Sequence, residues 1–382
     1  MCHQWKVQLK GIELLVLGLM LVLAFPSVSH SAELTLETAG GVDSNPFRLS
    51  DTFPVDSEVY WKNRLSFEVG ESSPWEWRFS ATDWRFPGDD RADATVTTTR
   101  LGRLIELGES DHTLNLSAGA RINDRTFVSR SQGDVYTTGG QEAGERYNYD
   151  RWDISADFDF RFKNRRTLQL DFEYRDQDYD DFTDLGISNL DYRAIDLELT
   201  WQAYLNKQFR YRLILDVNHR DYDDRRSKTQ AGTDIPGSDS EYDSLGFSVQ
   251  GRYRLSDRSY LYTTIGYSER EDNGGGYYDT DALTASIRYR YRWPSDATLW
   301  VSAYYRDLDY ARGALLQDVE NDAEPPSTAG WRMVVTYDHP LKKYERGTLS
   351  WFTNARYHNY RSDRSIYEYD RWTWEVGLRF TR

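Results

Sequence analysis

The sequence is poor in cysteine, in long apolar runs and in positive charge. Its 382 residues contain one cysteine, Cys2, which excludes an internal disulfide. The single long apolar run, Ile12–Phe25, excludes a bundle of transmembrane helices, because each helix would need about 20 such residues. Lysine and arginine total 47 against 62 acidic residues, which gives a formal net charge of -15. A nucleic-acid binder would need a basic face, so we do not expect that class.

Aromatic and charged residues are both abundant. Phe, Trp and Tyr make up 15% of the chain, which argues against disorder. Charged residues make up 29%, and the mean hydropathy is -0.76. A chain that is both polar and aromatic fits two classes of protein, a soluble all-β protein or a membrane barrel with a polar interior.

The N-terminus has the pattern of a secretory signal peptide. Lys6 and Lys10 precede the apolar run Ile12–Phe25, and small residues follow it. The alternative is a membrane anchor, which is disfavoured because the run is shorter than the roughly 20 residues of a spanning helix. We therefore predict a signal peptide at residues 1–32 and one β-barrel domain at residues 33–382.

The rest of the chain alternates between apolar and polar residues. In the segment Trp152–Phe162 every even position is apolar and every odd position is polar or charged. This period of two is typical of a strand with one apolar and one polar face. Similar runs recur along the chain and predict an all-β, antiparallel fold of about 16 strands, within a range of roughly 14 to 18. An even number is typical of single-chain bacterial outer-membrane barrels.

The expected connections alternate in length. Short ones, such as 70–74 and 107–111, alternate with long ones, such as 124–147 and 221–240. This pattern predicts a transmembrane barrel with short periplasmic turns and long extracellular loops. Trp and Tyr residues at strand ends beside both kinds of connection match interfacial girdles. A soluble β-sandwich or propeller is the alternative, and the number of strands and the lack of a blade-length repeat disfavour it.

Two short motifs resemble those of Gram-negative outer-membrane barrels. The segment Gly41–Arg48 is similar to the opening of β-barrel porin type 2 proteins and of the barrel part of surface lipoprotein assembly modifiers. That resemblance implies an outer-membrane location and a link to exopolysaccharide systems or surface-protein export. The segment Tyr369–Phe380 resembles the C-terminal strand that the barrel-assembly machinery recognises. The resemblance implies that Phe380 is an assembly signal, although Thr381 and Arg382 follow it.

The sequence offers little for catalysis or metal binding. Four histidines follow the signal and are scattered along the chain: His112, His219, His339 and His358. His219 lies near the expected outer rim, but the sequence places no serine beside it, so a barrel lipase is not expected. Acidic tracts lie in three expected loops, Asp176–Asp184, Asp221–Asp224 and Asp318–Glu324. We interpret them as solvated loops, with weak Ca²⁺ binding as the alternative, and expect no enzyme activity, no metal site and no cofactor.

If the apolar face of each strand meets lipid, the alternate residues face the lumen. This parity predicts a wall that is acidic on one stretch of strands and basic on the next. The predicted pore-lining residues are Asp157, Asp159, Asp171, Glu173, Asp196, Glu198, Arg210, Arg212, Arg252, Arg254, Arg288, Arg290 and Arg292. They either form a charged constriction that selects polar solutes or pair with one another across the sheet.

We therefore predict a porin-like channel in the outer membrane for passive diffusion of small polar or charged solutes, oligosaccharides included. Two alternatives stay open. One is a dedicated export or secretion barrel of an exopolysaccharide or surface-protein pathway, and the other is a non-conducting structural or adhesion barrel. The expected partners are outer-membrane lipid and lipopolysaccharide, the barrel-assembly machinery during biogenesis, and a polar solute or saccharide, with no nucleic acid among them.

Overall fold

The structure is a computed structural model of the chain. It describes residues 32–50, 53, 56–70, 74–108, 111–129, 133–138, 140–163, 165–186, 188–310, 328–362 and 365–382. The predicted signal peptide lies outside the described residues except for Ala32, which opens the first strand. The acidic tract Asp318–Glu324 also lies outside them. Within the described ranges, no helix is both long enough and apolar enough to cross a membrane.

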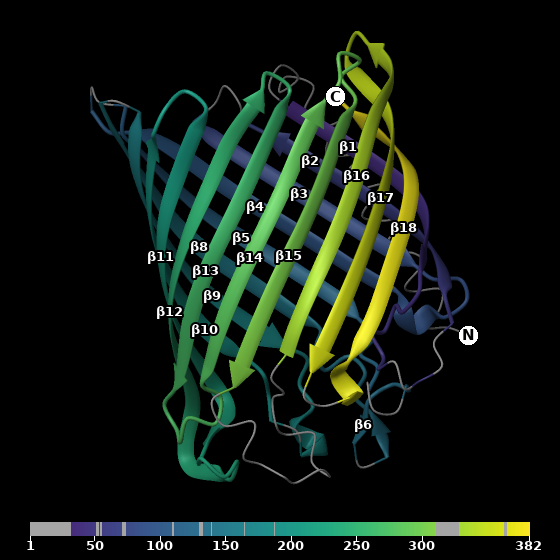
Figure 1. Cartoon of the computed structure of the whole chain (residues 1–382). Helices are drawn as coiled ribbons and strands as arrows, with labels where there is room; N and C mark the ends of the chain where they lie inside the picture. Colours follow the sequence, from purple (N-terminus) through teal and green to yellow (C-terminus); the bar gives the residue numbers. More distant parts are fainter. Residues whose placement is uncertain are drawn as a thin grey trace.

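The described strands form one closed antiparallel barrel (Figure 1). The first half consists of β1 (Ala32–Asp43), β2 (Glu58–Val69), β3 (Trp75–Arg85), β4 (Ala94–Glu106), β5 (Thr113–Arg125), β8 (Tyr149–Phe162), β9 (Arg166–Tyr179) and β10 (Tyr192–Tyr204). The second half consists of β11 (Phe209–Lys228), β12 (Asp234–Ser256), β13 (Ser259–Asp272), β14 (Thr280–Arg292), β15 (Thr298–Tyr310), β16 (Thr328–Tyr344), β17 (Gly347–Ser362) and β18 (Tyr369–Thr381). Each strand pairs with its neighbours along the chain, and β1 pairs with β18 to close the sheet. The predicted all-β barrel of 16 strands is confirmed.

Minor elements lie between the barrel strands. A two-stranded hairpin, β6 (Thr137–Thr138) and β7 (Gln141–Glu142), sits in the connection from β5 to β8. Three short 3-10 turns complete the described elements: η2 (Asp90–Ala92), η3 (Thr183–Leu185) and η4 (Ser365–Tyr367). All of these lie at the same end of the barrel, because they join strands whose opposite ends carry the tight turns.

The two faces of the sheet differ in polarity. Large apolar side chains project outward along the strands and stay exposed, for example Trp61 at 55%, Ile265 at 63% and Leu378 at 46%. Their alternate neighbours are polar and face inward, as the period of two in the sequence requires. The described barrel therefore turns its apolar face out and its polar face in, which is the inverse of a soluble β-sandwich.

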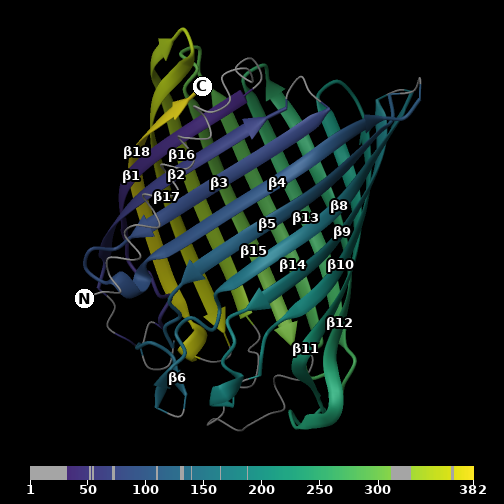
Figure 2. The same ribbon diagram turned by 180° about the vertical axis from the view of Figure 1, so that it is seen from behind.

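The two ends of the barrel differ in the length of their connections. At the end that we call the short-turn end, β14 and β15 are joined by a turn in which Asp296 adopts a left-handed φ of 65°. The chain termini of the barrel meet at this end, where the backbone N–H of Leu34 donates to the carbonyl of Arg382 and the reverse bond also forms, both at 2.9 Å. The opposite, long-loop end carries the longer connections (Figure 2).

One predicted loop is wrong. The chain at 221–240 was expected to be a long connection, but β11 runs to Lys228 and β12 begins at Asp234, with register shifts after Asp221. The extended hairpin projects beyond the barrel wall at the long-loop end (Figure 1). Apolar alternation stops near Val217 because a strand outside the apolar band needs no apolar face, while backbone pairing continues without it.

Aromatic side chains pack in clusters on the outer face near both ends. At the short-turn end Trp293 meets Tyr291 at 4.8 Å and Tyr337 at 5.6 Å between ring centroids. At the long-loop end Trp152 meets Tyr174 at 5.3 Å, and a second pair, Trp331 and Tyr357, meets at 4.9 Å. Two rims of amphipathic rings, one at each end of an apolar band, match the girdles predicted from the sequence.

Candidate functional site: the interior wall

The candidate site is the interior face of the sheet, because the predicted functional residues all lie there. Cross-strand register places each of the thirteen on the face opposite the exposed apolar residues of its own strand: Asp157, Asp159, Asp171, Glu173, Asp196, Glu198, Arg210, Arg212, Arg252, Arg254, Arg288, Arg290 and Arg292. The sheet brings the acidic members together on β8–β10 and the basic members on β11, β12 and β14. Their partners differ, and the difference divides the wall into parts.

One rung of the acidic wall carries four carboxylates on four adjacent strands. Asp157 on β8 stands opposite Asp171 on β9, which stands opposite Glu198 on β10, which stands opposite Asp216 on β11. We call these four residues the acidic row. Directly opposed like charges destabilise a sheet, so the row is costly for the fold. Asp216 is not among the residues predicted from the sequence, although its position between the apolar Leu215 and Val217 indicates an inward-facing side chain.

The acidic row has polar hydrogen-bond partners, and none of its four carboxylates forms an ion pair with a described residue. The Asn115 amide donates to Asp157 at 3.3 Å, and the Thr200 hydroxyl donates to Glu198 at 2.8 Å. Gly246 leaves the space that the Asp216 carboxylate occupies, since a Cβ built there would lie 2.2 Å from an Asp216 oxygen. The row therefore presents net negative charge to the lumen.

The neighbouring acidic residues are compensated by arginines. Glu173 pairs with Arg175 at 2.7 Å and with Arg100 at 3.5 Å. Arg175 also reaches Asp196 at 3.3 Å. Two of the six predicted acidic residues thus belong to an ion-pair network, while Asp159 accepts a hydrogen bond from the Gln169 amide at 2.7 Å.

The basic wall interleaves arginines with aromatic rings. On one rung Arg210 on β11 stands opposite Arg252 on β12, which continues through Tyr262 on β13 to Arg288 on β14. On the adjacent rung Arg254, Tyr260, Arg290 and Trp300 follow in the same way. The sequence-based list held the arginines alone. The rings Tyr260, Tyr262 and Trp300 could have been assigned to the interior from the alternation within 259–268 and 298–306. These two runs alternate weakly, because aromatic residues occur on both faces.

The arginines of this wall divide into held and unheld side chains. Turn carboxylates hold the two nearest the short-turn end, since Arg254 pairs with Asp257 and Arg292 pairs with Asp296 at 2.8 Å. Arg212 donates to the Gln202 amide oxygen at 2.9 Å. The remaining four, Arg210, Arg252, Arg288 and Arg290, form no ion pair within the described part of the chain.

Aromatic faces are the main contacts of three of these unheld arginines. The Arg252 guanidinium lies 4.5 Å from the Tyr260 ring centroid, and the Arg290 guanidinium lies 4.9 Å from that of Trp300. Arg288 is exposed and lies 5.8 Å from the same Trp300 centroid. Each such contact contributes about 0.5–1 kcal/mol at an exposed site, so it orients a guanidinium without neutralising it.

Two cavities open on the interior wall. The larger, about 430 Å³, lies on the β1–β4 side and mixes signs of charge, with Glu33, Glu68, Arg64, Arg78 and Arg100 in its lining. The smaller, about 140 Å³, lies on the basic wall at the short-turn end. Its lining is Tyr204, Lys207, Gln208, Arg210, Arg252, Arg254 and Tyr260. The smaller cavity has no carboxylate in its lining, so it is chemically suited to an anion.

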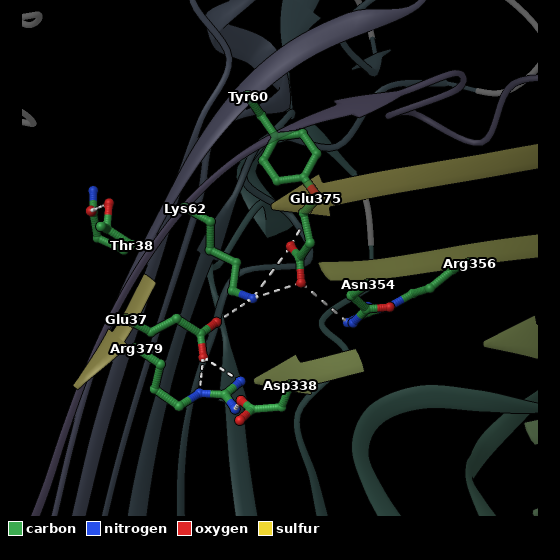
Figure 3. A network of polar contacts seen from close by, with 10 residues as sticks. Glu37, Thr38, Tyr60, Lys62, Asp338, Asn354, Arg356, Glu375 and Arg379 are labelled. Atoms are coloured by element: carbon green, nitrogen blue, oxygen red, sulfur yellow. Dashed lines mark hydrogen bonds and ion pairs between the residues drawn. The ribbon is translucent and has the colours of Figure 1, made fainter. Parts of the chain in front are cut away.

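A different kind of network closes the barrel where its first and last strands meet (Figure 3). Lys62 on β2 lies between Glu37 at 2.8 Å and Glu375 at 3.1 Å, and all three are buried. Arg379 extends the chain of charges from Glu37 at 2.9 Å to Asp338 at 2.7 Å. We call these five residues the closure network. Positive and negative charges alternate along it, so each is compensated.

The Gly41–Arg48 motif contributes contacts to the same junction between the first and last strands. The Tyr60 ring crosses over Gly41, where a Cβ would come within 2.8 Å of it, and its hydroxyl donates to Glu375 at 3.0 Å. Asp43 pairs with Arg371 across the β1–β18 junction, and the Asn45 side chain both donates to and accepts from the backbone of Leu49 at 2.8 Å. The motif thus has a structural use at the barrel junction.

At the long-loop end tyrosines pack on the interior face. Ring centroids of Tyr192, Tyr222 and Tyr242 follow one another at 5.5 and 5.4 Å, and Tyr278 from the β13–β14 loop packs on Tyr242 at 5.7 Å. Loop carboxylates are also held here. The Asp191 carboxylate accepts from the backbone N–H of Tyr179, and burial raises its pKa above the ordinary aspartate value.

The histidines stay apart. The His219 ring nitrogen Nδ1 lies 2.8 Å from Asp243 on the outer face, where its strand neighbours Val217 and Asp221 supply no nucleophile. No group of three or more His, Cys, Asp or Glu side chains in the described ranges is arranged to hold a metal ion. The interior wall thus offers fixed charge and aromatic surface.

Comparison with known proteins gives structural neighbours alone. No protein-family model matches the chain, and no curated protein matches it by sequence. A bacterial polysaccharide outer membrane secretin is 10% identical, over 93% of this chain and 98% of its own, with a TM-score of 0.47. A loop L8 deletion mutant of OmpT from Vibrio cholerae is 12% identical, over 92% and 99%, with a TM-score of 0.45. OccK2 (OpdF) from Pseudomonas aeruginosa is 14% identical, over 92% and 98%, with a TM-score of 0.44. No functional argument rests on these likenesses, and the resemblance of Gly41–Arg48 to two barrel families stays a prediction.

Proposed function

We propose that the chain is an outer-membrane channel through which small polar or charged solutes diffuse. The exposed apolar band on the exterior would be unstable in water and is stable in lipid. Closure of β1 on β18 leaves no unpaired strand edge, which is the condition for a sheet to cross a bilayer. The aromatic clusters at both ends would lie in the two membrane interfaces.

The asymmetry of the connections supports an orientation. Bacterial outer-membrane barrels have short turns on the periplasmic side and longer loops outside. The short-turn end, with the meeting of Leu34 and Arg382, is therefore proposed to face the periplasm. Lipid and lipopolysaccharide would contact the apolar band, and the barrel-assembly machinery would insert the chain.

The observation that carries the channel proposal is uncompensated charge on the interior wall. The acidic row and the four unheld arginines lie on the same closed sheet without pairing with each other. Buried charges without partners are very costly, so these groups need water. A barrel of about 16 strands is wide enough to hold an aqueous lumen. Water-filled space lined by fixed charge is the physical basis of an ion-selective diffusion pore.

The experiment is conductance in planar bilayers with purified full-length protein. The triple variant Arg288→Ala, Arg290→Ala, Arg292→Ala removes three positive charges from one strand of the lumen. Its reversal potential in a salt gradient should shift toward cations, and more strongly at low salt, where screening is weak. The matched control is Lys163→Ala, Arg166→Ala, Arg346→Ala, which removes the same charge from exposed positions in or directly beside short turns.

The outcomes of this experiment separate the channel from its two alternatives. An unchanged reversal potential in a folded, conducting triple variant would show that these arginines do not set selectivity. Zero conductance of the wild type would favour the structural or adhesion barrel over a channel. Conductance that only a polymer substrate can block from the short-turn side would favour the export barrel.

A further inference from the structure

The basic wall has a second property, a continuous surface of aromatic rings. Tyr260 and Tyr262 face the lumen from β13, with centroids 6.4 Å apart, and Trp300 from β15 lies 6.2 Å from Tyr262. All three side chains are only partly buried. Interior rings have neither lipid nor a packed core to contact, so exposing them to a wet lumen costs free energy that a soluble ligand would recover.

We propose that this wall is a binding track for an anionic saccharide, a chain of sugar rings that carry carboxylates. The inference rests on the proposed channel function and names its substrate class. We call the surface formed by Arg210, Arg252, Arg288, Arg290, Tyr260, Tyr262 and Trp300 the saccharide track. It runs from β11 to β15 on the short-turn half of the lumen.

The arginines of the track supply the recognition of charge. Guanidinium groups bind carboxylates through paired N–H donors, and these bonds are among the strongest in proteins. Arg252 and Arg288 face the lumen from strands on either side of β13, with Tyr262 between them. Since neither has a carboxylate partner among the described residues, both keep donors for a ligand.

The rings supply the recognition of sugar. The face of an aromatic ring is electron-rich and attracts the partly positive C–H groups on the flat face of a sugar. Alternation of ring and guanidinium along one rung matches a ligand whose apolar faces and carboxylates alternate. A simple anion such as sulfate would use the arginines and leave the rings without a role.

The small cavity gives the track an access point. Arg252 and Tyr260 belong both to the track and to the 140 Å³ cavity at the short-turn end, where Lys207 and Arg254 add positive charge. A polyanion would meet this positive patch first and then the rings. The acidic row, which runs across β8–β10 and ends at Asp216 on β11, would repel the polyanion from β8–β10 and keep it on the basic wall.

Nucleic acid is the less favoured polyanion. The chain carries a net charge of -15, and the acidic row lies beside the track, whereas nucleic-acid binders present a predominantly basic surface.

The test is calorimetric binding of trigalacturonate to the detergent-solubilised full-length protein, with maltotriose as the neutral sugar of equal length and sulfate as the plain anion. Trigalacturonate should bind at least about tenfold more tightly than maltotriose. The double variant Arg252→Gln, Arg288→Gln should weaken trigalacturonate by about tenfold or more, because charge-assisted bonds are lost. Trp300→Leu with Tyr262→Leu should weaken trigalacturonate by about tenfold and leave sulfate unchanged.

Two matched controls separate the track from general effects. Arg332→Gln removes one interior charge toward the long-loop end, over Tyr304, and Tyr289→Leu removes an outward-facing ring between Arg288 and Arg290. Both should leave trigalacturonate affinity within about twofold, since neither belongs to the track. Heat-modifiability of each variant on a gel shows whether it has folded.

The outcomes distinguish this inference from the channel proposal. Equal affinity for trigalacturonate and sulfate, unaffected by the loss of Trp300 and Tyr262, would overturn the saccharide track even if the protein conducts. Binding measured in detergent does not depend on conduction. Tight trigalacturonate binding to a non-conducting barrel would therefore support the track and overturn the channel.

Discussion

The closure network and the acidic row show two opposite treatments of charge on one interior wall. In the closure network Lys62 is buried between Glu37 and Glu375, and every charge has an opposite neighbour. In the acidic row Asp157, Asp171, Glu198 and Asp216 stand side by side and form no ion pair with a described residue. The first arrangement removes charge from the lumen, and the second presents it there.

The contrast separates structural charge from functional charge. Paired buried charges contribute to specificity of closure, because removing one partner strands the other. Unpaired like charges only cost stability, so their presence points to a role that stability does not explain. The same reasoning separates the four unheld arginines, which form no ion pair, from Arg254 and Arg292, which turn carboxylates hold. Variants that break one arrangement or the other test this division.

Loss of the last strand should abolish the barrel. Deleting Tyr369–Arg382 exposes unpaired edges on β1 and β17, which a bilayer does not tolerate. We expect unfolded chain in the periplasm and none in the outer membrane, measured by fractionation and by migration of boiled and unboiled samples.

A single substitution tests whether Phe380 is an assembly signal. Phe380→Ala should lower the amount of protein in the outer membrane. The Phe380 ring lies on the exterior, with its centroid 6.5 Å from that of Tyr344. Leu378→Ala, two residues earlier on the same face, is the control and should assemble normally. Normal levels of Phe380→Ala would contradict the signal role.

Breaking the closure network should cost stability. Lys62→Met leaves the buried Glu375 without its nearest cation, so the free energy of unfolding should fall by about 3–5 kcal/mol. Urea unfolding of protein refolded into lipid vesicles measures it. The double variant Lys62→Met, Glu375→Gln should recover much of the loss, because it removes the stranded charge as well. A fully additive pair would mean that the two side chains do not interact.

Neutralising the acidic row should have the opposite sign. Asp171→Asn with Glu198→Gln relieves repulsion between opposed carboxylates and should stabilise the barrel by about 0.5–1 kcal/mol. The same variant should shift the reversal potential toward anions. Glu173→Gln with Asp196→Asn is the matched control, since it also removes two negative charges but breaks ion pairs with Arg175 and Arg100, and it should destabilise. Destabilisation by both variants would end the distinction between the row and its neighbours.

The smallest effect concerns a loop outside the proposed membrane band. Burial raises the pKa of Asp191, so the folded protein holds this proton more tightly than the unfolded chain does. Local stability should therefore rise as the pH falls from neutrality through the raised pKa. Hydrogen exchange of the backbone amides of residues 188–192, corrected for intrinsic rates, should slow on acidification in the wild type. Asp191→Asn should remove this dependence, and equal pH dependence in both proteins would exclude Asp191 as its source.

Much of the fold could be predicted because barrel strands repeat a simple rule. Segments such as Trp152–Phe162 alternate strictly, and the predicted strand number and antiparallel order are confirmed by the closed sheet. The rule failed at 221–240, where charged residues fill both faces of a strand that pairs beyond the apolar band. Alternation reports only strands whose two faces meet different environments.

The candidate site was predictable by face but not by partner. Parity alone placed Asp171 and Arg288 on the interior, since successive side chains on a strand alternate sides. The pairing of Glu173 depends partly on its own strand and partly on the sheet, since Arg175 lies two residues further along β9 whereas Arg100 reaches the carboxylate from β4. Asp171 forms no ion pair with a described residue. Closure of β1 on β18 likewise brought Lys62 to Glu375, a contact between residues far apart in the chain. Alternation along the chain is enough to assign each residue to one side of the wall. Contacts such as Lys62–Glu375 depend on the closed sheet, because they join residues of different strands.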